Sequence, residues 1–84
     1  MIARMWEVVA HPEGFADLLS WVCEVAVVEL QGDLSLIDVQ VYTSPEQRIV
    51  VITKWRANPR LLSDPPRHTV RAGPFFADFS PVDL

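Results

Sequence analysis

The segment RIVVITKW, residues 48–55, constrains this chain more than any other stretch of its sequence. As a β-strand it is apolar on both faces, because successive side chains point to opposite sides of a sheet. One face carries Ile49, Val51, Thr53 and Trp55, and the other carries Arg48, Val50, Ile52 and Lys54. A chain of 84 residues has little material with which to cover both faces of a sheet. The sequence therefore raises the question of what covers the second face.

Length and composition predict one globular domain, residues 1–84. Half of the residues are hydrophobic and 21% are charged, which is typical of a folded chain. A core this small usually depends on a disulfide, a metal ion or a partner subunit. Cys23 is a single cysteine and cannot form an internal disulfide, and His11 and His68 stand apart from any zinc-ligand spacing. By elimination we expect oligomerisation, with no metal site.

Charge and hydropathy argue against two classes of partner. The net charge of −4 disfavours nucleic-acid binding, which needs a clustered basic surface. The arginines between positions 56 and 71 are interrupted by prolines and Asp64, as in a solvated loop. No apolar stretch approaches the ~20 residues of a membrane span, and the opening MIARMW lacks the plan of a signal peptide. We expect a cytoplasmic protein that binds neither nucleic acid nor a membrane.

Hydrophobic periodicity predicts an α+β chain. Residues 2–10 are rich in β-favouring types and are expected to form a strand. From Phe15 the apolar positions follow the i, i+3, i+4, i+7 pattern of an amphipathic helix. The β-branched residues of VAVVEL predict that this helix frays or ends within residues 25–30. The Gly-Asp pair at 32–33 is a natural stop and turn.

The second half predicts a hairpin and a final strand. Ile37, Val39 and Val41 alternate with polar residues, and the turn TSPEQ joins this strand to RIVVITKW. The segment RANPRLLSDPPR holds three prolines and allows at most one helical turn. Residues 68–79 are expected to form a last strand with a Gly-Pro break, typical of a bulge or a sheet edge. The order matches a ferredoxin-like βαββαβ plan, an antiparallel sheet with a truncated second helix.

One helix and a stub can shield only one face of such a sheet. The other face would show Val50, Ile52 and neighbouring apolar residues, a patch beyond the ~300–600 Å² found on monomers. A second copy pressing its sheet on the first would remove this patch. Burial of ~800 Å² per partner, at about 25 cal/mol per Å², would offset much of the shortfall of a small core, less the cost of association. We therefore predict a homodimer through the sheet face, and leave open whether the C-terminal tail swaps onto the partner.

The stretch MIARMWEVVAHPEGFADLLSWV, with the hairpin that ends in RIVVITKW, resembles the dimeric α+β barrel group that includes the antibiotic-biosynthesis monooxygenase-like proteins. The resemblance covers residues 1–56: a Met-Ile-Ala-Arg-hydrophobic-Trp opening strand and a third strand that ends at a Trp. It implies a homodimer whose sheets pack face to face, with a small pocket between sheet and helices in each subunit. In the enzymes of the group this pocket takes a polycyclic phenol or a haem, oxidised with molecular oxygen and without a separate flavin or metal cofactor.

Four residues are candidates for the lining of such a pocket: Trp6, Tyr42, Trp55 and His68. The two tryptophans could stack on an aromatic ligand, although large aromatics of central strands more often pack in the core. The imidazole of His68 could act as a general base, and a surface position is the alternative. Cys23 is expected to behave as a small buried hydrophobe. The sequence assigns no catalytic residue and no cofactor.

Two functions are consistent with these residues. The first is a cofactor-independent monooxygenase-like oxidoreductase that oxidises or cyclises an aromatic polyketide-type compound. The second is a non-catalytic dimeric module that binds a small ligand or a protein, favoured by the missing roof over the pocket. A cavity large enough for a bicyclic ring, with converging polar groups, would favour the enzyme. A pocket filled by the protein's own Trp and Phe side chains would favour the module.

Overall fold

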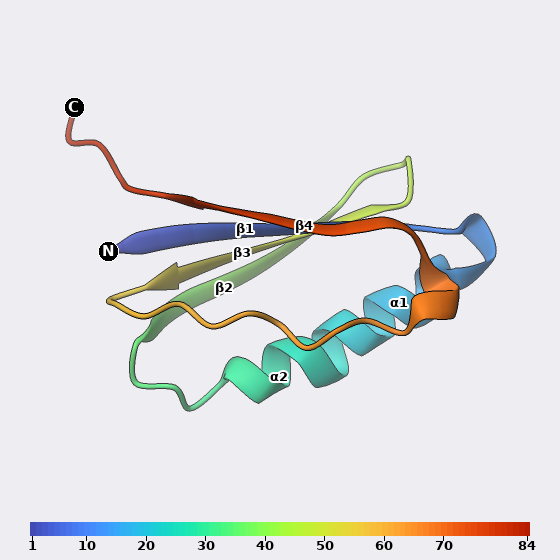
Figure 1. Cartoon of the computed structure of the whole chain (residues 1–84), viewed down its shortest axis with the longest axis horizontal. Helices are drawn as coiled ribbons and strands as arrows, with labels where there is room; N and C mark the ends of the chain where they lie inside the picture. The colour runs from blue at the N-terminus through green and yellow to red at the C-terminus, as the bar shows by residue number, and fades with distance from the viewer.

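The computed structural model describes residues 1–84 and shows a four-stranded antiparallel sheet with one helical layer on one side (Figure 1). The strands follow the order β2-β3-β1-β4, which is compatible with a ferredoxin-like fold. In chain order the elements are β1 (Ile2–Ala10), η1 (Pro12–Gly14), α1 (Phe15–Trp21), η2 (Val22–Ala26), α2 (Val27–Leu30), β2 (Leu36–Thr43), β3 (Arg48–Trp55), η3 (Arg67–Thr69) and β4 (Val70–Phe79).

The helix confirms the predicted apolar stripe. It starts at Phe15 and runs without interruption to Leu30, and its middle third, η2, is wound as a π-helix. It therefore ends inside the predicted range, and Gly32, with a φ of 91°, reverses the chain. One side of the helix is buried against the sheet: Leu18, Val22, Ala26, Val27 and Leu30. The β-branched residues are accommodated because their burial outweighs their weak intrinsic preference for helix.

The hairpin β2–β3 forms where the alternation predicts it, with one correction. Ile37 is 45% exposed, although its spacing from Val39 and Val41 predicts the core side. Leu36 pairs with Trp55 and Asp38 with Lys54, so that Ile37 is an extra residue in a bulge. Leu36 takes the inward position instead of Ile37.

The segment 56–66, which we call the crossover, connects β3 to β4 without a helix. The truncated second helix predicted for RANPRLLSDPPR does not form: residues 59–66 have no regular structure, and the only turn of helix before β4 is η3, after the two prolines. Pro65 and Pro66 disfavour helical backbone in the residues before them, which explains the extended path. The crossover runs on the same side of the sheet as the helix (Figure 1).

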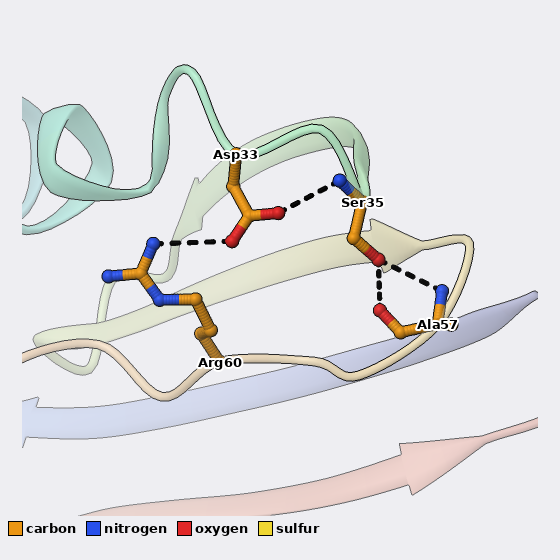
Figure 2. Close-up of polar contacts among 4 residues, drawn as sticks. All are labelled: Asp33, Ser35, Ala57 and Arg60. Carbon is orange, nitrogen blue, oxygen red and sulfur yellow. Dashed lines mark hydrogen bonds and ion pairs between the residues drawn. The ribbon is translucent and has the colours of Figure 1, made fainter.

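A cluster of polar contacts fixes the start of the crossover (Figure 2). The hydroxyl of Ser35 donates to the carbonyl of Ala57 and accepts from its N–H at 3.0 Å. Asp33 accepts from the backbone N–H of Ser35 at 2.8 Å and from the guanidinium of Arg60 at 3.2 Å. The bond from Ser35 N–H is the main reason why the pKa of Asp33 is lowered. These contacts join the turn before β2 to the segment after β3.

The core lies between the helix and the sheet. Trp55, Ile49 and Val51 of β3 are fully buried there, as are Val8 of β1 and the helix residue Leu18. This is the face that the sequence assigned to the odd-numbered residues of RIVVITKW. Only 15 of the 84 residues are buried, so the core is a single layer of side chains.

Candidate functional site

The four candidate pocket residues lie in three different environments. Trp6 and Trp55 are on the helix side of the sheet and are 4% and 0% exposed. Tyr42 is on the opposite face, 49% exposed, and its hydroxyl donates to Gln40. His68 lies exposed in the turn η3. Within one chain they do not line a common cavity.

Cys23 is exposed, which corrects the prediction of a buried position. The neighbouring stripe residues Val22 and Ala26 occupy the buried side of the π-helical stretch. Cys23 follows Val22 by one residue and is therefore rotated to the solvent side.

A groove lies between the crossover and β4, on the helix side of the sheet. Its wider part has a volume of about 500 Å³ and is lined by Asp64, Pro65, Arg67, Val70, Arg71, Ala72, Gly73 and Pro74. Its narrower part has a volume of about 190 Å³ and is lined by Trp6, Leu61, Leu62, Ser63, Asp64, Pro74 and Phe76. The two parts meet at Asp64 and Pro74, which line both. We call the whole feature the crossover groove.

The narrow part of the crossover groove is flanked by a fixed arginine. Arg4 donates two hydrogen bonds to Asp78, at 2.6 and 2.9 Å, and its guanidinium carbon lies 4.9 Å from the centre of the Phe76 ring. These bonds raise the pKa of Arg4 and lower the pKa of Asp78. The contact of the guanidinium with the ring orients Phe76. Since the charge of Arg4 is paired with Asp78, Arg4 adds no net charge to the groove.

The opposite side of the sheet, which we call the open face, is not covered by any element (Figure 1). The cross-strand registers place its side chains in rows, and its centre is apolar. Val50 and Ile52 lie there as predicted, beside Met5, and Phe75 and Phe79 are 58% and 53% exposed. The remaining open-face residues are Ala3, Glu7, Val9, Asp38, Gln40, Tyr42, Arg48, Lys54 and Ala77.

Charged residues of the open face lie toward both ends of the strands. At one end Arg48 donates to Glu7 at 2.7 Å, and this contact is the main reason why the pKa of Arg48 is raised. At the other end Asp38 is opposite Lys54 across the hairpin. Each end thus carries one acid and one base, and the apolar rows lie between them.

Sequence reasoning missed the role of Arg67, Arg71 and Phe76 in lining a cavity. The prolines between Arg56 and Arg71 favour a solvated loop for these arginines in the sequence. Their only sequence signal is their spacing of four, on either side of a strand start. Phe76 and Phe75 are adjacent in β4, so they point to opposite faces of the sheet. Phe76 lines the crossover groove and Phe75 belongs to the open face.

The described side chains form no group of three or more His, Cys, Asp or Glu that could hold a metal ion. None of the helices has both the length and the apolar character needed to cross a bilayer. In comparisons with family models, curated proteins and solved structures, no match to this chain was found. The resemblance to the monooxygenase-like barrels therefore stays a prediction.

Proposed function

We propose that this protein is a non-catalytic binding module that assembles as a homodimer through the open face. The observation that carries the proposal is the apolar centre of that face. Met5, Val50 and Ile52 lie in the two central strands, and Phe75 and Phe79 extend the apolar surface onto β4. A contiguous patch of this kind on a soluble chain marks an interface.

A second copy of the same face can supply the missing layer. A twofold partner that covers ~800 Å² of the open face would bring the pair into the range of stable dimers.

The charges of the open face suit a copy of the same face. The pairs Arg48–Glu7 and Asp38–Lys54 lie toward opposite ends of the strands, and each combines an acid with a base. A twofold axis through the apolar centre can therefore bring opposite charges of the two copies together at the ends of the strands. The apolar rows between them supply the burial.

The packing on the helix side of the sheet favours a non-catalytic binding module over an enzyme. Trp6 and Trp55 pack in the core, so the position between sheet and helix where an aromatic ligand was expected is filled by the protein's own side chains. The cofactor-independent oxygenase stays a prediction, and formation of an oxidised product from a polycyclic phenol such as anthrone by the purified protein would overturn the non-catalytic proposal.

Sedimentation velocity tests the dimer directly. We expect twice the chain mass for the unchanged protein, and a folded single chain for Ile52→Lys, because a lysine at the centre of the interface would be buried without a partner. Leu34→Lys is the matched control, since Leu34 is 91% exposed and lies outside the open face. A folded single chain for the unchanged protein at tens of micromolar, or an Ile52→Lys variant that still forms dimers, would contradict the proposal.

A further inference from the structure

We propose that the crossover groove binds an aromatic carboxylic acid that carries a hydroxyl or ammonium group beside its carboxylate, as in an aromatic hydroxy acid or amino acid. The groove residues Trp6 and Phe76 lie on the helix side of the sheet, away from the open face. The proposal therefore goes beyond the dimer and does not depend on it. Three parts of the groove carry it: a basic wide part, an acidic junction and an apolar narrow part.

The wide part presents two free guanidinium groups. The ion pairs of the chain involve Arg4, Arg48 and Arg60, so Arg67 and Arg71 have no acidic partner although the net charge is −4. Both line the same hollow of about 500 Å³. A guanidinium matches the geometry of a carboxylate through two parallel hydrogen bonds. Two of them in one hollow favour a carboxylate as the ligand group at this position.

Asp64 lies where the two parts of the groove meet. Its carboxylate takes part in none of the ion pairs or side-chain hydrogen bonds of the chain, and it can only accept hydrogen bonds when ionised. It would repel a plain carboxylic acid placed against it. A hydroxyl or ammonium group on the carbon next to the ligand carboxylate would donate to Asp64 and remove this repulsion.

The narrow part fits one aromatic ring. Its lining includes Trp6, Phe76, Leu61 and Leu62. An apolar cavity of ~150 Å³ accommodates benzene, so about 190 Å³ is room for a single aromatic ring. The contact between Arg4 and Phe76 holds one wall in place. An aromatic ring joined by a short linker to the acid group is therefore the expected occupant.

Titration with 3-phenyllactate, followed by ¹H–¹⁵N NMR, tests the site. We expect shifts of the Trp6 indole N–H and of the Arg67 and Arg71 amides, and no shift at Tyr42 on the open face. Two analogues isolate the polar groups: 3-phenylpropanoate lacks the hydroxyl, and 3-phenylpropane-1,2-diol lacks the carboxylate. Each should bind about threefold to tenfold more weakly, as expected for the loss of one charge-assisted contact at a partly exposed site.

Variants assign the contacts to residues. Arg67→Gln and Arg71→Gln should each weaken 3-phenyllactate binding about threefold to tenfold. Lys54→Gln, the control, removes a cation from the open face, outside the groove, and should leave binding unchanged. Asp64→Asn should reduce the preference for 3-phenyllactate over 3-phenylpropanoate. Leu61→Ser should weaken binding of the ring, whereas Leu34→Ser should not.

The failure of this proposal is distinguishable from failure of the dimer. Absence of shifts at Trp6 up to millimolar 3-phenyllactate would overturn the groove proposal, and so would equal binding of 3-phenyllactate and its diol analogue. Unchanged binding in the Arg67→Gln, Arg71→Gln double variant would also overturn it. Sedimentation of the same samples reports the open face separately, because neither arginine belongs to it.

Discussion

The indole N–H of Trp55 donates to the hydroxyl of Thr53 at 2.8 Å, and both side chains are buried. Thr53→Val keeps the shape of the side chain but leaves this N–H without an acceptor. We expect a loss of about 1–3 kcal/mol in the free energy of unfolding, the usual cost of an unsatisfied buried donor. Urea denaturation at fixed chain concentration measures it. Thr43→Val, at an exposed position of β2, is the control and should change stability little. Equal effects of the two substitutions would contradict this role for Thr53.

The ion pair of Arg4 and Asp78 predicts a dependence of stability on pH. Hydrogen bonding from Arg4 lowers the pKa of Asp78 from its ordinary 3.8 in the folded chain. The unfolded chain therefore takes up the proton first, so the pair stabilises the fold above about pH 4 and the contribution disappears as pH falls through the lowered pKa. Asp78→Asn should reduce the decrease in stability at acidic pH, whereas Asp83→Asn in the exposed tail should not. Thermal midpoints between pH 2 and 7 measure the difference, and identical slopes for all three proteins would be evidence against the pair.

At the scale of elements, Gly73 permits the irregular pairing of β4 with β1. Its φ is 92°, and a Cβ at this position would lie 3.0 Å from the carbonyl oxygen of Glu7. Gly32 has nearly the same φ, 91°, and no atom within 4 Å of such a Cβ. Gly32→Ala should therefore cost only the conformational penalty, about 1–2 kcal/mol. Gly73→Ala should cost more, because the backbone of β1 or β4 must also shift. Chemical denaturation of the two variants separates the conformational penalty from the steric cost. A smaller loss of unfolding free energy for Gly73→Ala than for Gly32→Ala would exclude this crowding.

The elements that the sequence predicted well are those set by local pattern. The alternation in RIVVITKW assigns Ile49 and Val51 to the core, and the helical stripe assigns Leu18 and Val22 to it, because burial follows directly from periodicity in both cases. The position of Ile37 was wrong because a bulge changes which residues share a face, and a bulge leaves no mark in the alternation itself.

The candidate site was less predictable because it depends on contacts between distant segments. Tyr42 and Trp55 lie in neighbouring strands, and only their register separates them onto opposite faces. Similarly, Trp6 and Leu61 line the same groove because an extended segment without a sequence pattern of its own passes over the sheet. No pattern in a single sequence predicts the path of such a segment. It did identify Trp6 as a candidate, since an aromatic residue in a central strand is limited to the core or a cavity wall.

At the scale of the whole molecule, the sheet has one sheltered face and one open face, and the second limits the stability of an isolated chain. A core of 11 buried hydrophobic residues in a chain of 84 is small for independent folding. If the open face is buried against a second copy, unfolding releases two chains, and the thermal midpoint must depend on chain concentration. Stability measured at one concentration would then combine the fold of the chain with the association of the pair.

We therefore expect the thermal midpoint of the unchanged protein to rise by several degrees over a hundredfold increase in chain concentration, because association is favoured by mass action. Ile52→Lys should unfold at a lower midpoint that does not change with concentration. Leu34→Lys should follow the unchanged protein. Differential scanning calorimetry between about 10 µM and 1 mM provides the comparison. A constant midpoint for the unchanged protein would mean that the open face is tolerated by a single chain, and that Val50, Ile52 and Phe75 are stable in contact with water.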